Sequence, residues 1–218
     1  MCATWGSPCG FQASGRAAQR EAGPDTRPRA GAGDGVPVRQ FQSQAPVLGQ
    51  RVYVDDTALV IGQVILADDV SLWPYVVARG DVNAIRIGAR SNIQDLSVLH
   101  VTHDGPYSPG GFALAIGEDV TVGHRCVLHA CTIGDRCLVG MGSIVMDGAV
   151  IEDEVLLAAG SLVGPGKRLE SGYLYRGSPA RKLRPLAAPE RDMLRYSAAH
   201  YLGLKDRCLS VAGISGGQ

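Results

Sequence analysis

The histidines of this chain are concentrated in one short segment. Four of the five, His100, His103, His124 and His129, lie between residues 100 and 129. Imidazole is the commonest metal ligand among side chains, and because it titrates near neutral pH it can also take up or release a proton. The segment therefore predicts metal binding, acid–base chemistry or both. Which of these is available depends on the elements that carry the four side chains.

An aliphatic residue returns every six residues through this part of the sequence. The series from Ile116 is Ile116, Val122, Leu128, Ile133, Val139, Val145, Ile151, Leu157 and Val163, with one step of five after Leu128. The same spacing joins Ile87, Ile93 and Leu99, and we extend it back to Ile61, Ala67 and Trp73. Such a period fits neither a helix nor ordinary strand alternation. It predicts an all-β solenoid, a parallel β-helix in which each hexad forms one short strand and three hexads close one coil.

The hexad has a second inward position, four residues after the aliphatic one. There the sequence has small or modest side chains, namely Val120, Cys126, Cys137, Ser143, Ala149, Val155 and Ser161. Small inward residues allow the coil to close, so we expect Cys126 and Cys137 to pack in the core. No CxxC spacing occurs among the six cysteines, which disfavours a disulfide framework or a cysteine zinc site.

Composition divides the chain into four parts. Residues 1–45 are dominated by Ala, Gly, Arg and Pro without periodicity, and we expect a disordered or non-native extension there. Residues 46–186 form the predicted β-helix domain. A C-terminal α-helix is expected over residues 187–208, because Pro189, Glu190 and Asp192 suit a first turn. Residues 209–218 are expected to be a flexible tail.

The charge balance restricts the kinds of partner. Lys and Arg number 21 and Asp and Glu number 21, which gives a formal net charge of zero. Binding of nucleic acid or an anionic membrane surface relies on a basic excess, so we expect neither. No apolar run reaches the roughly 18 residues of a membrane span, and no basic-then-apolar leader begins the chain. These features predict a cytoplasmic protein with a small-molecule substrate.

The hexad register places the histidines. If Ile87, Ile93 and Leu99 occupy the three faces of one coil, the next coil restarts at Ile116, and VTHDGPYSPGGFALA between them is an excursion loop. Leu128 then stacks above Leu99. His129 therefore stacks above His100, and both point outward.

His124 belongs to a neighbouring face, so within one chain it should point away from that pair. A closed trimer would bring different faces together, with His100 and His129 of one subunit meeting His124 of the next. Three imidazoles leave a fourth position open for water, as in a catalytic zinc site. Neutral imidazoles also accept Fe²⁺ or Co²⁺, so the sequence does not single out zinc.

The motifs around these histidines resemble the γ-carbonic-anhydrase family of β-helix proteins. The resemblance rests on RGD at 79–81, on the blocks NIQD…LH and VGHxxxLH, and on the closing SGYLYRGSPARKLRPL, and it covers about residues 49–201. It implies a left-handed coil, a homotrimer, and His100, His124 and His129 as zinc ligands. It also implies an ion-pair network between subunits, formed by Arg79, Asp81 and Asp95.

The resemblance suggests further residues at the reaction site. Asn92 and Gln94 match polar residues near the solvent at the metal, where an amide can orient CO₂ without a change of charge, although an outward solvated position is the alternative. Tyr175 is a further candidate. The family's fully active members carry a Glu where this chain has Val82, and a second acid on the following loop. His103 is the candidate to export the proton, with a loop histidine of no role as the alternative.

The predicted function is metal-dependent, reversible hydration of CO₂ to bicarbonate at trimer interfaces. Three alternatives stay open. The same metal could hydrolyse an acyl-CoA thioester, since an activated water attacks either carbonyl. The chain could be a hexapeptide-repeat acyltransferase, which shares the fold and uses a histidine base. It could also be an accessory, catalytically silent metal-binding subunit.

Overall fold

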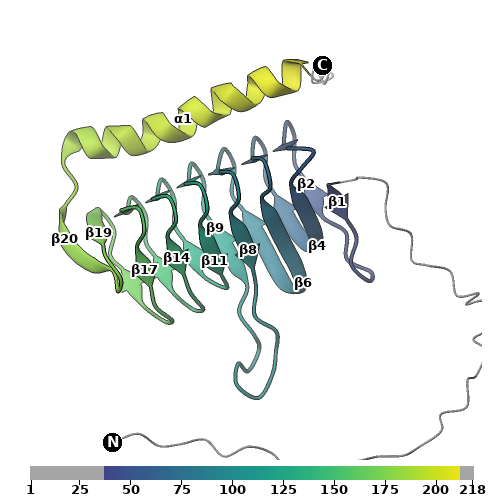
Figure 1. Cartoon of the computed structure of the whole chain (residues 1–218), viewed down its shortest axis with the longest axis horizontal. Coiled ribbons are helices and arrows are strands. Elements are labelled where there is room, and N and C mark those ends of the chain that lie inside the picture. The colour runs from purple at the N-terminus through teal and green to yellow at the C-terminus, as the bar shows by residue number, and fades with distance from the viewer. Residues whose placement is uncertain (1–36, 212–218) are drawn as a thin grey trace, which may run out of the picture. The chain divides into compact units, whose positions relative to one another are not determined.

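A computed structural model describes residues 37–211 of the chain. They form a parallel β-solenoid with one α-helix at its C-terminal end, which confirms the predicted fold class (Figure 1). The elements are β1 (Val38–Arg39), β2 (Val47–Leu48), β3 (Tyr53–Val54), β4 (Leu59–Leu66), β5 (Ser71–Leu72), β6 (Val77–Ile87), β7 (Asn92–Ile93), β8 (Val98–His100), β9 (Leu114–Ile116), β10 (Thr121–Val122), β11 (Val127–His129), β12 (Thr132–Ile133), β13 (Leu138–Val139), β14 (Ile144–Val145), β15 (Val150–Ile151), β16 (Leu156–Leu157), β17 (Leu162–Val163), β18 (Arg168–Leu169), β19 (Tyr173–Arg176), β20 (Arg181–Pro185) and α1 (Ala188–Val211).

The strands stack in register from coil to coil. One face of the solenoid is the sheet β20-β19-β16-β13-β10-β7-β5-β3, in which β20 alone runs antiparallel to its neighbour β19. The other two faces, β8-β11-β14-β17 and β9-β12-β15-β18, are joined into one sheet through the long strand β6. The cross-coil pairs Ile87 with Ile116, Ile93 with Val122 and Leu99 with Leu128 are those that the hexad register predicts.

The core consists of the inward aliphatic residues and the small residues between them. Ile93, Leu99 and Leu128 have no exposed surface. Cys126 and Cys137 are buried free thiols in this core, as predicted. Burial raises the pKa of Cys126 to about 11 and that of Cys137 to about 12, so both thiols stay protonated and unreactive.

The phase predicted for the first coils is wrong by one residue. The buried residues are Val60, Leu66 and Leu72, and not Ile61, Ala67 and Trp73. Leu66 pairs with Ile87, and Leu72 pairs with Ile93. Aliphatic residues occupy most positions of β4, so the six-residue period alone leaves its phase open. The Trp73 ring instead packs against the rings of Tyr53 and Tyr201.

The ordered region extends beyond the predicted boundaries on both sides. Strand β1 pairs with β4, so the solenoid begins before residue 46. Helix α1 continues past the expected end at residue 208, and Leu209 is buried. The rest of the expected N-terminal extension (1–36) and C-terminal tail (212–218) lies outside the described residues. Helix α1, the helix found within residues 37–211, lacks the apolar length that a membrane crossing requires.

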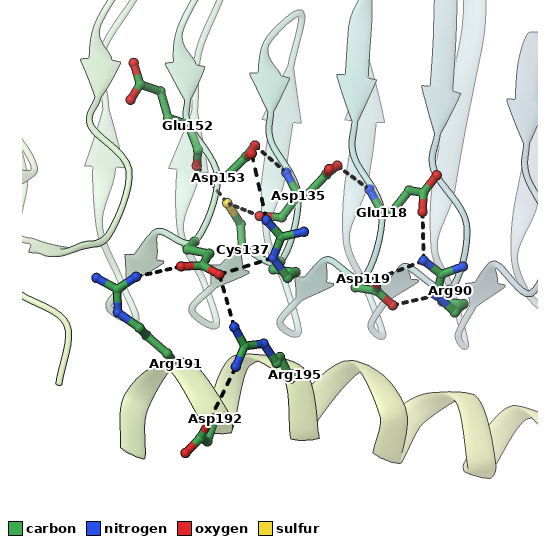
Figure 2. A network of polar contacts seen from close by, with 12 residues as sticks. Arg90, Glu118, Asp119, Asp135, Cys137, Glu152, Asp153, Arg191, Asp192 and Arg195 are labelled. Carbon is green, nitrogen blue, oxygen red and sulfur yellow. Dashed lines mark hydrogen bonds and ion pairs between the residues drawn. The ribbon is translucent and has the colours of Figure 1, made fainter. Parts of the chain in front are cut away.

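One corner of the solenoid carries a ladder of alternating charges. Its residues have positive φ angles, which non-glycine residues adopt at an energetic cost; they are Arg51, Asp69, Arg90, Asp119, Arg136 and Glu154. Each arginine pairs with the acid of the next coil, as Arg90 does with Asp119 at 2.7 Å (Figure 2). Helix α1 adds Arg191, whose guanidinium lies 2.7 Å from Glu154. The ion pairs thus stabilise the corner and attach the helix to it.

The C-terminal half of α1 is anchored by a buried lysine. Lys205 has no exposed surface, and its Nζ donates to Asp69 Oδ1 at 2.9 Å and to the Arg51 carbonyl at 3.2 Å. Burial opposes ionisation of Asp69, but the hydrogen bonds from Arg51 and Lys205 outweigh it and hold its pKa below the ordinary value. The lysine and carboxylate therefore form a buried pair between α1 and the first coils.

Replacing this lysine tests the anchor. Lys205→Met removes the lysine from the Asp69 carboxylate, which keeps Arg51 as its other partner. Since breaking a buried pair costs about 3 kcal/mol or more when the remaining charge is unpaired, we expect a loss of about 2 kcal/mol here. We expect that loss in the free energy of unfolding, measured by urea denaturation at fixed protein concentration. Arg207→Met, an exposed position on the same helix, is the matched control and should change it by less than about 0.5 kcal/mol. Equal losses in both variants would contradict a specific anchor.

Candidate metal centre

Two of the histidines lie side by side on one face of the solenoid. His100 ends β8, His129 ends β11, and the two are register partners. His100 Nδ1 lies 3.1 Å from His129 Nε2. The backbone pairing and the buried Leu99 and Leu128 beneath the two histidines fix this arrangement. The predicted stacking is confirmed.

Each imidazole is backed by a carboxylate on its other nitrogen. His100 Nε2 lies 3.1 Å from Asp81 Oδ1, and His129 Nδ1 lies 2.6 Å from Asp147 Oδ1. Burial opposes ionisation of both acids, but hydrogen bonds hold the pKa of Asp81 and of Asp147 below the ordinary value. An ionised carboxylate only accepts, so each imidazole donates its proton there. The lone pairs of His100 Nδ1 and His129 Nε2 then face each other.

This donor set fits a divalent metal ion. Two lone pairs at 3.1 Å repel unless a cation lies between or beside them. Zinc bound tetrahedrally at about 2.0–2.1 Å from two nitrogens holds them about 3.3 Å apart, close to the separation found. Burial lowers the pKa of His100, against its hydrogen bond to Asp81, which favours the neutral, ligating form. A carboxylate behind each histidine is the usual surrounding of a metal ligand.

The third histidine lies on a different face. His124 follows β10, its Nδ1 lies 2.9 Å from Asp95 Oδ2, and its side chain is 42% exposed. Within residues 37–211 of one chain, no group of three His, Cys, Asp or Glu side chains converges as a metal site. A single chain therefore presents two candidate ligands on one face and one on another. The His124–Asp95 pair repeats the arrangement of the other two histidines, with Nε2 left free.

The predicted ion-pair network is divided within one chain. Arg79 pairs with Asp81, which also accepts from His100, whereas Asp95 pairs with His124. Asp81 and Asp95 thus each hold a candidate ligand. That Arg79, Asp81 and Asp95 form an ion-pair network between subunits stays a prediction.

Asn92 and Gln94 lie on the face that carries His124. Both side chains are buried, so the alternative of an outward solvated position is wrong. Gln94 Nε2 donates to Asn92 Oδ1 at 3.2 Å, and Asn92 Nδ2 donates to Thr121 Oγ1 at 3.0 Å. The amide of Gln94 is therefore held in one orientation beside His124, with which it lines a groove.

Neither Tyr175 nor His103 is a hydrogen-bond partner of the paired histidines within residues 37–211. Tyr175 is buried in β19 above Leu157, and its hydroxyl accepts from the backbone N–H of Glu170 at 2.8 Å. One chain does not bring it to the histidines, so its catalytic role stays a prediction. His103 is exposed on the loop between β8 and β9, which projects from the solenoid as expected (Figure 1). Its role in proton transfer also stays a prediction.

Two contacts of the site were not foreseen from the sequence. Asp147, which binds His129, also accepts from the hydroxyl of Thr102. It lies two residues beyond the inward Val145 in the coil after His129. The sequence could have indicated Asp147, because it is an acidic residue in the turn after β14, the strand that pairs with the histidine strand β11.

An apolar groove of about 370 Å³ begins beside His124. It runs over β10, β13, β16 and β19 toward α1, and its lining includes Met141, Leu138, Leu156 and Leu174. The groove is larger than a substrate of three atoms requires.

Known proteins resemble this chain along most of its length. Residues 130–165 match the family model for the bacterial transferase hexapeptide (six repeats). Protein YrdA of Escherichia coli is 59% identical over 172 residues, which are 79% of this chain and 94% of that protein. Gamma carbonic anhydrase 1, mitochondrial, of Arabidopsis thaliana is 40% identical over 74% of this chain and 58% of its own length.

A solved structure agrees with these relatives. The hexapeptide transferase family protein of Anaplasma phagocytophilum superposes with a TM-score of 0.72 at 40% identity, covering 78% of this chain and 97% of that one. The chain therefore belongs to the γ-carbonic-anhydrase-like family of hexapeptide-repeat proteins.

Proposed function

We propose that the protein is a zinc-dependent carbonic anhydrase that interconverts CO₂ and bicarbonate at sites shared between the subunits of a homotrimer, in the cytoplasm. The observation that carries the proposal is the pair of facing ring nitrogens, His100 Nδ1 and His129 Nε2, which lie 3.1 Å apart, each on an imidazole backed by a carboxylate. The name of the Arabidopsis relative supports the same reaction.

The proposed trimer follows from the incomplete ligand set. The face that carries His100 and His129 also exposes an outward row of aliphatic residues, Val98, Val127 and Ile144, each 37–40% exposed. Such a contiguous apolar row favours contact with a second copy of the chain. In that contact, His124 of the neighbouring subunit would supply the third ligand, and three imidazoles leave one position open.

The chain's own residues have distinct parts in this proposal. Zinc, when bound, supplies the Lewis acidity that allows water to ionise near neutral pH. Asp81 and Asp95 keep the ring protons of His100 and His124 away from the metal side. Gln94, fixed by Asn92, orients CO₂ or bicarbonate beside His124. His103 stands on the loop that begins next to His100, where an imidazole can pass the released proton to solvent.

A second candidate function is hydrolysis of an acyl thioester at the same metal. The apolar groove beside His124 favours it, because an acyl chain would bury apolar surface there. Both functions would use the same three histidines, but only thioester hydrolysis would use the groove, to hold the acyl chain. Val139 and Gly140 also line the groove, so it is formed by the coils of the solenoid.

Metal binding is tested by stability. Zinc at 100 times its dissociation constant should raise the free energy of unfolding of the metal-free protein by about 2.7 kcal/mol per site. His129→Ala should abolish this gain, because it removes one of the two facing nitrogens. His103→Ala, an exposed histidine of the same segment, is the control and should keep it. The measurement is thermal unfolding with and without zinc; a gain that survives His129→Ala would count against the site.

Activity is tested by stopped-flow CO₂ hydration on the zinc-loaded protein. We expect turnover in the wild type and a loss of at least about 100-fold in His129→Ala, because replacing even the partner of a metal-bound histidine costs about 10- to 100-fold. A panel of acyl-CoA thioesters on the same samples tests the second candidate. Equal hydration rates in both proteins would refute the carbonic anhydrase, and zinc-dependent thioester turnover in its place would favour the alternative.

A further inference from the structure

Asp147 contacts both a candidate metal ligand, His129, and the loop between β8 and β9, through Thr102. It stands in the turn between β14 and β15, one coil beyond His129, and its side chain is 32% exposed. Oδ1 lies 2.6 Å from His129 Nδ1, and Oδ2 accepts the hydroxyl proton of Thr102. One carboxylate thus binds a candidate metal ligand with one oxygen and a loop residue with the other.

Thr102 forms the neck of the excursion loop. It exchanges two backbone hydrogen bonds with Phe112, each 3.0 Å, and Asn83 Nδ2 donates to its carbonyl at 3.2 Å. A Cβ on Gly111 would lie only 2.5 Å from that carbonyl oxygen, so the two sides of the neck are in close contact. The neck begins two residues after His100 and is therefore next to both histidines of the pair.

Asp147 and Asp81 differ in the second partner of their carboxylates: a neutral hydroxyl for Asp147 and a guanidinium for Asp81. Asp81 shares its charge between His100 and the guanidinium of Arg79. Asp147 accepts from His129 and from the neutral hydroxyl of Thr102. Without a hydrogen-bond acceptor at Nδ1, His129 could carry its ring proton on Nε2 and donate it to His100 Nδ1, which would tie up both facing nitrogens.

We propose that Asp147 is a positioning residue of the metal centre, which keeps His129 Nε2 free to ligate and, through Thr102, joins the loop neck to that ligand. The inference rests on the metal binding of the proposed function and adds the residue that prepares one ligand. It predicts that metal affinity depends on a carboxylate and a hydroxyl that do not touch the metal.

The test is zinc affinity of the full-length protein, measured by competition with a chromogenic chelator. Asp147→Asn should weaken zinc binding by roughly 10- to 100-fold, the usual effect of removing a partner of a metal-bound histidine. Thr102→Val should weaken it less, because His129 keeps its carboxylate. Thr102→Ser, which retains the hydroxyl, is the matched control and should bind zinc as the wild type does.

Two further readouts separate positioning from general stability. The absorption bands of the Co²⁺-substituted protein should shift in Asp147→Asn and not in Thr102→Ser. Thermal unfolding of the metal-free proteins measures the structural effect of each substitution, and Asp147→Asn should lower zinc affinity by more than it lowers this stability. If Asp147→Asn does not fold, the two Thr102 variants test the proposal. Weaker zinc binding by Thr102→Val than by Thr102→Ser would support it, and equal binding would overturn it.

The outcomes distinguish this inference from the proposed function. Wild-type zinc affinity and an unchanged Co²⁺ spectrum in Asp147→Asn would overturn the inference alone. A drop in affinity matched by an equal loss of metal-free stability would also overturn it, because the role would then be structural. Tight zinc binding that depends on Asp147, in a wild type without CO₂ hydration, would support the inference and refute the carbonic anhydrase.

Discussion

The structure depends on the parallel register between successive coils. The backbone pairing of β8 with β11, above the buried contact of Leu99 with Leu128, places His129 on His100 although 29 residues separate them. Because adjacent strands lie about 4.8 Å apart, two imidazoles at equivalent positions are close enough to share one metal ion. The register that builds the solenoid therefore also positions this pair of histidines.

The corners and the helix preserve that register. Six non-glycine residues with positive φ occupy one corner, and the alternation of arginine and acid along it offsets part of their conformational cost. The helix α1 closes over the same corner through Arg191 and Lys205. These ion pairs do not involve His100 or His129. The contacts that stabilise the solenoid and the residues of the candidate site therefore lie at different corners of the coil.

The sequence predicts the contacts that the six-residue period sets, within and between coils, and misses side-chain pairs that the period does not set. Period and register were enough to predict the burial of Cys126 and the stacking of His129 on His100, because both follow from counting hexads. Counting does not set the phase where aliphatic residues are continuous, as at Ile61. It also does not reveal pairs such as Lys205 with Asp69, 136 residues apart, since these depend on how the helix returns over the coils. The partner of His129 at Asp147 belongs to the same class.

The central claim is that one metal site takes ligands from two subunits. The most direct measurement is the zinc content of mixed trimers assembled from His124→Ala and His129→Ala chains. Each variant alone should bind no zinc at the site, because every interface lacks one ligand. In a mixed trimer, the interface that joins the intact His129 of one chain to the intact His124 of the next is complete, so we expect mixing to restore zinc binding. Mixed trimers as empty as the two parents would contradict it.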